Sequence, residues 1–269
     1  MGNFYGLIGE KLGHSISPKI HLEIFKKLKI DANYSLFEIK KENLSDAVKG
    51  LKALGCGGVN VTIPYKVEVM KFLDGISEEA QKIGAVNTLV FNNGIKGYNT
   101  DYYGFGCTLK REGIEVKGKS VVILGTGGAA KAVLQYLIDN NTRNITFASG
   151  NPVDAKEKIK GHNIISYSEL KHIEKKDIIL NCTPCGMYPK IDVSPVELNV
   201  IEKFSVAVDL IYNPVETLLL KNAKAAGLST ANGLYMLVAQ AAAAEELWQD
   251  TKFSSEFIDD LYEAVKGGI

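Results

Sequence analysis

The sequence predicts an α/β protein of two domains, the second built on a doubly wound parallel sheet. Short apolar segments that suit buried strands alternate with segments whose apolar residues recur at helical spacing. This alternation is typical of parallel sheets whose strands are joined by crossover helices. The chain has 269 residues, a length that accommodates two modest domains at about 100–200 residues each.

The first domain is expected within residues 1–101 and has a mainly parallel sheet. Ser17 and Pro18 open its first helix and predict a serine N-cap followed by a proline in the first turn. In chain order, the expected segments are a strand at 4–9, a helix at 17–30, a strand at 34–39, a helix at 44–54, a strand at 58–63 and a hairpin over 87–99.

The second domain is expected over residues 102–236. Its strand at 120–125 is a continuous apolar run, as expected for a strand covered on both faces. The C-terminal segment does not follow the strand–helix alternation, so residues 237–269 are expected to return and complete the first domain. The other expected segments are a helix at 129–140, strands at 144–149, 177–183 and 206–212, a helix at 216–227, and helices at 233–248 and 255–267.

A glycine-rich sequence follows the strand at 120–125 and opens the next helix. Gly125-Thr126-Gly127-Gly128-Ala129-Ala130 fits the G-x-G-x-x-G/A pattern of Rossmann-type dinucleotide-binding domains. In that pattern the first glycine permits a tight turn, the second lets the backbone approach a pyrophosphate, and the final small residue allows close packing. The N–H groups at the helix N-terminus favour an anion. The alternative is a glycine-rich turn without a ligand.

The end of the second strand distinguishes NAD from NADP in such domains. An acidic residue there binds the ribose hydroxyls of NAD, and an arginine accommodates the 2′-phosphate of NADP. Here Ser149, Gly150 and Asn151 occupy the position, and the first acidic residue after them is Asp154. These residues by themselves leave both cofactors open.

Polar residues near the end of the strand at 58–63 are candidates for a substrate site. Asn60 and Thr62 share one side of the strand, and Lys66 follows at the start of an expected helix. Ligands of open α/β sheets bind outside the C-terminal ends of the strands. Asp101 is the candidate partner, because a lysine and a carboxylate can share proton transfer to a hydroxyl. Taken singly, Lys66 also fits an exposed lysine and Asp101 a helix N-cap.

Two further pairs of residues have side chains that could bind or react. Ser15 and Ser17 lie in a loop where two hydroxyls can bind a carboxylate, although Ser17 alone fits an N-cap. Cys182 and Cys185 form a C-x-x-C pair, but no second pair accompanies them. The four histidines have no metal-ligand spacing, so no metal site is expected.

Composition excludes several classes of protein. Lys plus Arg equals Asp plus Glu at 31 each, so the basic excess of a nucleic-acid-binding protein is missing. No apolar run reaches the roughly 18 residues of a membrane span. Four cysteines are too few for a disulfide scaffold. The N-terminal residues lack the features of a signal peptide, and we expect a cytoplasmic protein that binds a small molecule rather than nucleic acid or membrane.

Several motifs together resemble one family over nearly the whole chain, the shikimate dehydrogenases. The combination of the N-V-T-I-P-Y-K segment, the later N-T-D and the glycine-rich loop is specific to it. The matching segments are GHSISP (13–18), GVNVTIPYK (58–66), GAVNTL (84–89), GYNTDYYG (97–104), GTGGAA (125–130), NCTPCGM (181–187), DLIYNP (209–214) and NGLYMLVAQ (232–240).

The resemblance implies roles for individual residues. Lys66 and Asp101 are the implied catalytic pair. Residues 125–130 are the implied pyrophosphate site, and Leu210 and Gly233 line the nicotinamide side. The residues implied to bind the substrate are Ser15, Ser17 (at its carboxylate), Thr62, Lys66, Asn87, Asp101, Gln240 (at its hydroxyls) and Tyr212.

The chain departs from the family pattern at 149–151. NADP-specific members usually carry Asn-Arg-Thr there, and the arginine stacks on adenine and pairs with the 2′-phosphate. Here Ser149, Gly150 and Asn151 replace them, and Lys156 or Lys158 would have to supply the charge. We therefore expect NADP as cofactor, with NAD possible.

The resemblance implies reversible, NADP-dependent reduction of 3-dehydroshikimate to shikimate, in chorismate and aromatic amino-acid synthesis. One alternative is a quinate/shikimate dehydrogenase with broader substrate and cofactor specificity. A more remote alternative is a non-catalytic ligand sensor on the same fold, which intact Lys66, Asp101 and the glycine-rich loop oppose. A homodimer is expected as the oligomeric state.

Overall fold

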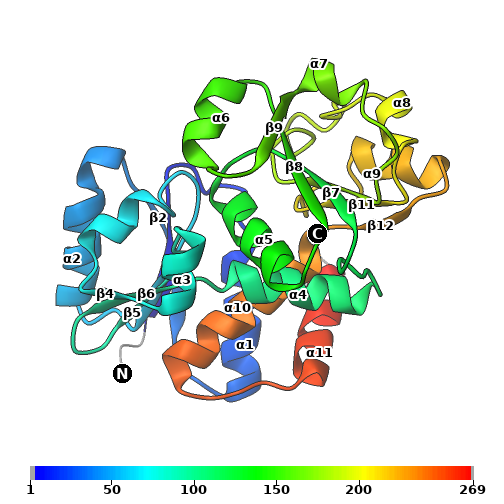
Figure 1. Ribbon diagram of the computed structural model, residues 1–269. Coiled ribbons are helices and arrows are strands. Elements are labelled where there is room, and N and C mark those ends of the chain that lie inside the picture. Colours follow the sequence, from blue (N-terminus) through cyan, green and yellow to red (C-terminus); the bar gives the residue numbers. More distant parts are fainter. Residues whose placement is uncertain (1–3, 268–269) are drawn as a thin grey trace. The chain divides into compact units, whose positions relative to one another are not determined.

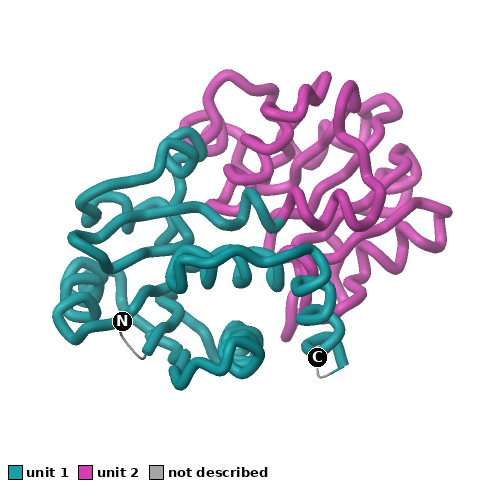
Figure 2. The backbone as a smooth tube through the Cα atoms, turned by 90° about the horizontal axis from the view of Figure 1, so that it is seen from below, with its two compact units in different colours: residues 1–104, 237–268 teal, residues 105–236, 269 magenta. Residues whose placement is uncertain are grey.

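The computed structural model describes residues 4–267. The chain divides into two compact units, which Figure 2 shows in different colours. Of the described residues, unit 1 combines 4–104 with 237–267, and unit 2 comprises 105–236. The chain therefore leaves unit 1 once and returns to it once. Among residues 4–267, no helix has the length and apolar character needed to cross a bilayer.

Unit 1 contains a mixed six-stranded sheet. The strand order is β2-β1-β3-β5-β6-β4, and β5 runs antiparallel to both of its neighbours. The other three ladders are parallel. Its elements are β1 (Phe4–Gly9), α1 (Ser17–Leu28), β2 (Asn33–Glu38), the 3-10 helix η1 (Lys41–Asn43), α2 (Leu44–Ala53), β3 (Gly58–Val61), the 3-10 helix η2 (Glu68–Phe72), β4 (Gly75–Ile76), α3 (Glu78–Ile83), β5 (Thr88–Phe91), β6 (Ile95–Tyr98), the start of α4 (Asp101–Arg111), most of α10 (Leu234–Gln249) and α11 (Ser255–Lys266).

The unit 1 sheet is covered on both faces because its strands alternate their side chains. In β1, Tyr5 and Leu7 pack with residues of α1 and α10, including Phe25 and Trp248. Ile8, which points the other way, packs with the apolar stripe of α2. The C-terminal helix α10 thus supplies part of the core of unit 1, beside α1 (Figure 1).

Unit 2 contains an entirely parallel six-stranded sheet. The strand order is β12-β11-β10-β7-β8-β9, the doubly wound order of dinucleotide-binding domains. Its elements are the remainder of α4 and the start of α10, with β7 (Ser120–Leu124), α5 (Gly128–Asp139), β8 (Asn144–Ser149), α6 (Pro152–Lys158), β9 (Asn163–Ser166), α7 (Tyr167–Leu170), β10 (Ile178–Asn181), α8 (Leu198–Ile201), β11 (Val206–Asp209), α9 (Leu218–Ala225) and β12 (Ser229–Ala231).

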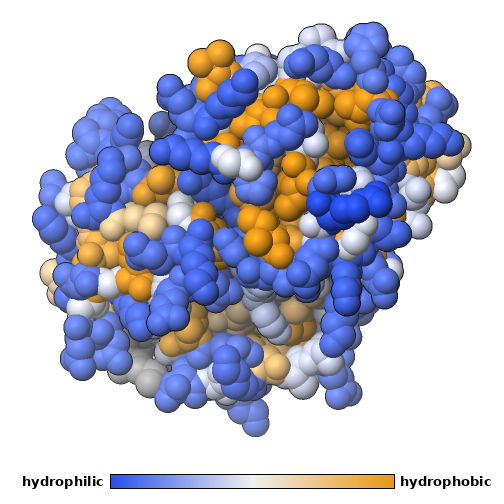
Figure 3. Space-filling model, viewed as in Figure 1, coloured by the Kyte–Doolittle hydropathy of each residue, from blue (hydrophilic) through white to orange (hydrophobic). Residues whose placement is uncertain are grey.

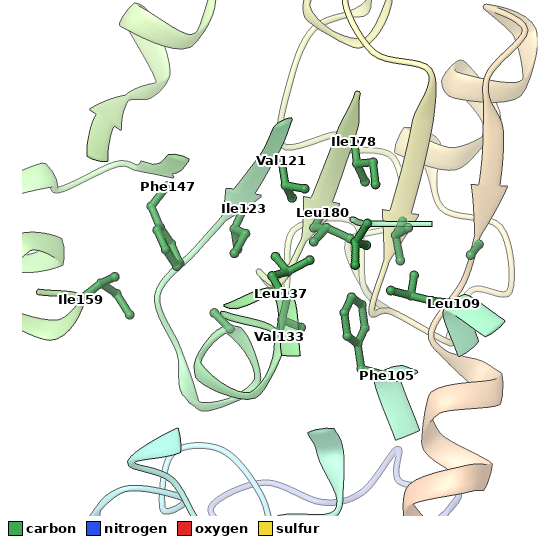
Figure 4. Packing of buried hydrophobic residues seen from close by; sticks show 14 of the residues in the cluster. Phe105, Leu109, Val121, Ile123, Val133, Leu137, Phe147, Ile159, Ile178 and Leu180 are labelled. Atoms are coloured by element: carbon green, nitrogen blue, oxygen red, sulfur yellow. The ribbon is translucent and has the colours of Figure 1, made fainter. Parts of the chain in front are cut away.

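Two separate cores cover the two faces of this sheet. Val121 and Ile123 of β7 pack with Phe105 of α4 and with α5, as Figure 4 shows. Val122 and Leu124, on the opposite face, pack with α7, α8 and α9. Every residue of β7 is buried, which explains its continuous apolar run.

The structure confirms the α/β fold and its main elements and corrects some local expectations. Helix α1 begins at Ser17, but its N-cap is Ile16 and no side chain caps it. Lys66 precedes the 3-10 helix η2 in a turn and does not begin an α-helix. Several short elements are present that the local patterns do not predict, namely η1, η2, β4, α3, α6, β9, α7, α8 and β12.

Hydrophilic residues are spread over the face of the molecule drawn in Figure 3, with apolar residues exposed between them. The most exposed large apolar side chains include Leu54 at 74% and Val153 at 73% exposure.

Close packing of α10 on β3 makes Gly58 a test of the unit 1 core. A Cβ at Gly58 would lie 2.1 Å from Nε1 of Trp248, whose N–H donates to the carbonyl of Leu89. We predict that Gly58→Ala lowers the free energy of unfolding by about 1–3 kcal/mol, as overpacking does. The control is Gly50→Ala in α2, where a Cβ meets nothing within 4 Å, and which should be neutral or stabilising. Equal effects of the two variants in urea denaturation would contradict this account.

Candidate functional site

The topology of unit 1 gathers the predicted substrate residues at one edge of its sheet. The C-terminal ends of β1 and β3 lie side by side because the two strands are parallel neighbours. The antiparallel pair β5 and β6 brings the start of β5 and the end of β6 to the same edge. Two backbone hydrogen bonds fix the junction, from Val61 N–H to Asn87 O at 2.8 Å and from Asn87 N–H to Tyr98 O at 3.0 Å.

Lys66 and Asp101 form an ion pair at this edge. The Lys66 Nζ donates to Asp101 Oδ2 at 2.6 Å, and the side chains are 13% and 7% exposed. Asp101 is the first residue of α4, but the side-chain oxygen of Asn99 accepts from the Tyr102 N–H at 3.2 Å. The carboxylate of Asp101 is therefore engaged by Lys66 and is not an N-cap. Both residues thus lie together, and neither is the isolated surface group that each resembles singly.

Asn87 connects the Lys66–Asp101 pair to its surroundings. Its Nδ2 lies 3.0 Å from Asp101 Oδ1 and 3.3 Å from Oε1 of Gln240 on α10. Its Oδ1 accepts from the Thr100 N–H at 2.7 Å. The structure thus brings Lys66, Asp101, Asn87 and Gln240 into one buried polar cluster, although 153 positions separate Asn87 from Gln240.

Ser15 lies in the loop after β1, Ser17 is the first residue of α1, and Thr62 follows β3. The Ser15 hydroxyl lies 3.1 Å from the Ser17 hydroxyl and 3.3 Å from the Ser17 N–H, so the two serines form one local group. Thr62 N–H donates to Ile8 O at 2.9 Å, which ties the β3 end to β1. Tyr212, the remaining predicted substrate residue, follows β11 in unit 2.

A second layer of buried polar groups supports this edge, and the sequence analysis did not find it. Asn60 is not a candidate ligand residue, because its amide bonds Thr88 Oγ1 at 3.1 Å and its Oδ1 accepts from Tyr34 at 2.8 Å. The Tyr34 ring stacks on His21 at 4.0 Å, and Nδ1 of His21 lies 2.5 Å from Glu245 Oε1. No local sequence pattern predicts these contacts, because Glu245 is 224 positions from His21.

The glycine-rich segment in unit 2 fits the pyrophosphate of a dinucleotide. Gly125 has φ +92°, and a Cβ there would lie 2.8 Å from the Thr183 methyl, so the position requires glycine. Gly127 is the N-cap of the 12-residue helix α5, and no side chain caps it. A Cβ at Gly127 would meet nothing within 4 Å. The N–H groups that begin α5 are thus not capped by a side chain and can bind an anion.

The loop after β10 lies against this segment, and the Leu210 N–H after β11 donates to Asn181 O at the end of β10 at 3.0 Å. Gly233 packs on Leu210, since a Cβ there would lie 1.9 Å from the Leu210 carbonyl oxygen. The Gly233 N–H donates to Ile211 O at 3.0 Å. Leu210 and Gly233, which the resemblance places on the nicotinamide side, are therefore neighbours at the end of β11.

Asp209 is a buried carboxylate at the end of β11. Its Oδ1 accepts from Asn181 Nδ2 at 3.0 Å and from Ile211 N–H at 3.1 Å, and its Oδ2 accepts from Thr217 at 2.7 Å. Burial raises the pKa of Asp209 to about 6, although these three hydrogen bonds lower it.

The segment at 149–151 forms a turn held by its own hydrogen bonds. The Ser149 hydroxyl bonds the backbone of Asn151, and the Asn151 side chain caps α6 by accepting from the Asp154 N–H at 3.2 Å. Lys158 pairs with Asp154 at 2.6 Å, so its charge is already compensated. Gly150 is exposed, and a Cβ there would meet nothing within 4 Å. The turn therefore has room for a larger side chain.

Cys182 and Cys185 are poor candidates for thiolate chemistry. Burial raises the pKa of both thiols, and the negative charge of Asp209 adds to this. Among the described residues, no cluster of three or more His, Cys, Asp or Glu residues is arranged to hold a metal ion.

Comparisons with known proteins agree with this geometry. Residues 7–89 match the family model of the shikimate dehydrogenase substrate binding domain. A Clostridium perfringens protein named shikimate dehydrogenase (NADP(+)) is 50% identical over 265 residues, which cover 97% of this chain and 98% of that protein. The chain belongs to the shikimate dehydrogenase family.

Solved structures support the same conclusion for this shikimate dehydrogenase family member. A chorismate mutase/shikimate 5-dehydrogenase fusion protein from Clostridium acetobutylicum is 54% identical, with a TM-score of 0.96 and coverage of 100% of this chain and 99% of that one. A shikimate dehydrogenase in complex with NADP⁺ is 40% identical, with a TM-score of 0.86 and coverage of 99% and 96%. The similarity thus extends over both units.

The raised pKa of Asp209 predicts an unusual dependence of stability on pH. The folded-state pKa of about 6 exceeds the ordinary value of 3.8, so ionisation opposes folding above pH 6. This penalty is relieved as the pH falls through 6 toward 3.8. Relative to Asp209→Asn, which cannot ionise, the wild-type chain should gain about 1–2 kcal/mol of unfolding free energy between pH 7.5 and pH 5. Urea denaturation of both proteins at the two pH values measures this, and a constant difference between them would contradict the raised pKa.

Proposed function

We propose that this chain is an NADP-dependent shikimate dehydrogenase, which reversibly reduces 3-dehydroshikimate to shikimate. The observation that carries the proposal is the buried Lys66–Asp101 pair, at 2.6 Å, joined to Asn87 and Gln240. The relatives named above carry the same activity in their names. Their similarity covers both the substrate residues of unit 1 and the glycine-rich segment of unit 2.

Lys66 is the proposed proton donor in the direction of reduction. Its Nζ carries the proton, and Asp101 holds the ammonium group in a fixed place through a charge-assisted hydrogen bond. As negative charge develops on the substrate oxygen, Lys66 stabilises it and transfers the proton. NADPH supplies the hydride when it is bound. Asn87 and Gln240 would orient the substrate hydroxyls, and Ser15 with Ser17 would bind the carboxylate.

NADP is the proposed cofactor in spite of the missing arginine. A carboxylate at the end of the second strand would repel a 2′-phosphate, and Ser149 occupies that place. Since Lys158 is paired with Asp154, Lys156 is left as the exposed cation on α6 that is best able to add charge. The NADP preference should therefore be smaller than in relatives with an arginine at this position.

Lys66→Met should nearly abolish turnover while cofactor binding persists. Loss of a general acid typically costs about 10²–10⁴ in rate. The measurements are steady-state kinetics with shikimate and NADP⁺, and calorimetric titration with NADP⁺. Lys71→Met is the matched control, because Lys71 pairs with Glu68 on the surface and is 65% exposed. A Lys66→Met protein that keeps more than about a tenth of wild-type turnover would refute the role.

Ser15→Ala and Ser17→Ala should raise KM for shikimate more than they lower kcat. Contacts to a carboxylate remote from the reacting carbon contribute equally in the ground and transition states. Loss of one hydrogen bond to a charged group weakens binding by roughly 1.5–3 kcal/mol. Ser35→Ala on the edge strand β2 is the control. A large fall in kcat with KM unchanged would assign the loop to the chemical step instead.

Gly150→Arg should increase the preference for NADP over NAD. Gly150 is exposed with open space around it, so an arginine is accommodated without a clash. The wild-type preference should shrink as salt rises, because exposed lysines are screened. Catalytic efficiency with NADP and NAD at two ionic strengths measures both effects, and Gly50→Arg in unit 1 controls for net charge. The NADP assignment would be wrong if NAD were the better cofactor at low salt.

The substrate alternatives can be separated in the same assay. Activity with shikimate but not quinate supports the proposed reaction, and comparable activity with both supports the broader quinate/shikimate enzyme. Binding of shikimate without turnover indicates a ligand sensor. The homodimer and the cytoplasmic location stay predictions, and light scattering after gel filtration tests the first of these.

A further inference from the structure

We propose that Asp209 is a positioning residue for cofactor binding, whose carboxylate holds the loops at the C-terminal edge of the unit 2 sheet in their binding arrangement. The inference rests on the proposed function, since it assigns the cofactor to these loops. Asp209 itself is 0% exposed, so it acts through other residues and does not touch the cofactor.

Three contacts from two segments converge on this carboxylate: two come from the 210–217 segment that joins β11 to α9, and one comes from the end of β10. Its hydrogen bond with Ile211 N–H shapes the chain just after Leu210, which packs directly on Gly233. Its hydrogen bond with Thr217 reaches the N-cap of α9, where the same hydroxyl accepts from the Leu220 N–H at 3.3 Å. The third contact, with Asn181, reaches the loop after β10.

Asn181 extends this arrangement to the glycine-rich segment. Its Oδ1 accepts from the Thr183 N–H at 3.0 Å and from the Thr183 hydroxyl at 2.7 Å. The Thr183 methyl in turn lies against Gly125. Asp209 is therefore connected to both segments proposed to hold the dinucleotide. It reaches Leu210 and Gly233 through the Ile211 N–H, and Gly125 through Asn181 and Thr183.

The charge of Asp209 is what makes these contacts strong. Hydrogen bonds to an ionised acceptor are roughly twice as strong as neutral ones. Protonation converts Oδ2 into a donor and leaves Oδ1 a neutral acceptor, so all three contacts become weaker and both segments are held less tightly. No described lysine or arginine forms an ion pair with Asp209, so the three neutral donors alone stabilise its charge.

Few other titratable groups surround Asp209. The loop after β10 presents the thiols of Cys182 and Cys185, whose pKa values are raised and which stay neutral near pH 6. On the α9 side, Glu216 precedes Thr217 but pairs with Lys224 at 2.6 Å on the surface. Lys221, also on α9, is exposed. Asp209 is thus the group whose titration changes the charge inside this part of the fold.

The test is calorimetric titration of wild type and Asp209→Asn with NADP⁺ and with NAD⁺, at pH 7.5 and pH 5. The asparagine resembles the protonated carboxyl, because its amide can donate to Thr217 and its oxygen can accept from Ile211. We expect Kd for Asp209→Asn to be three- to tenfold higher at pH 7.5. At pH 5 the two proteins should agree within about twofold.

Two controls isolate the effect. The 2′-phosphate of NADP⁺ itself titrates near pH 6. Its titration affects Kd of both proteins equally, so it cancels in the ratio of their Kd values, and NAD⁺ lacks the group. Asp192→Asn removes an exposed negative charge from the same unit and should leave Kd unchanged. A ratio of one at pH 7.5, a ratio independent of pH, or tighter binding by Asp209→Asn would each overturn the proposal. Tighter binding would mean that Asp209 merely repels the cofactor phosphates.

A second pair of variants keeps the test decisive if Asp209→Asn does not fold. Thr217→Val removes a donor to Oδ2, and Thr217→Ser keeps it. Only the valine variant should raise Kd and shift the change of Kd with pH to a higher pH, because loss of this donor raises the pKa of Asp209 further. Equal Kd values for the two folded variants would overturn the proposal. Failure of wild type to bind NADP⁺ at pH 7.5 would instead refute the proposed function.

Discussion

The reversal of β5 within an otherwise parallel sheet is the constraint on which the proposed substrate site depends. A fully parallel sheet would place the start of β5 at the edge opposite the end of β3. Because β5 runs antiparallel to β3, Asn87 lies beside Val61, and the following β6 returns the chain to the same edge at Asp101. Lys66 then meets a carboxylate 35 positions away in sequence.

The two units use buried carboxylates in different ways. Asp101 faces a lysine, and removing one partner of such a pair leaves an uncompensated buried charge. Asp209 faces only neutral donors, which lower its pKa less than burial raises it. In the roles proposed for them, the first arrangement keeps a proton available at Lys66 Nζ, whereas the second holds the segments around Asp209 together. Both carboxylates are buried. They differ in their partners, which are a lysine for Asp101 and three neutral donors for Asp209.

Sequence reasoning succeeded for elements with strong local patterns. The apolar run of β7 and the glycine pattern after it predicted a strand, a turn and a helix where the structure has them. It omitted β9 and β12, which are three- or four-residue strands with too few residues to show a period. The serine cap expected at Ser17 was wrong, because its hydroxyl lies instead against Ser15 and Ile16 occupies the N-cap.

Local patterns in the sequence predict the α/β class and the glycine-rich segment, and the family motifs predict the site roles of Lys66, Asp101, Asn87 and Gln240. These follow from local periods and short motifs, which neighbouring residues encode. Contacts between distant residues, such as Gln240 with Asn87 or Glu245 with His21, depend on the tertiary packing and are not encoded by neighbouring residues. The raised pKa of Asp209 has the same origin. Desolvation depends on every segment that packs around the carboxylate, and the residues next to it in the sequence do not reveal it.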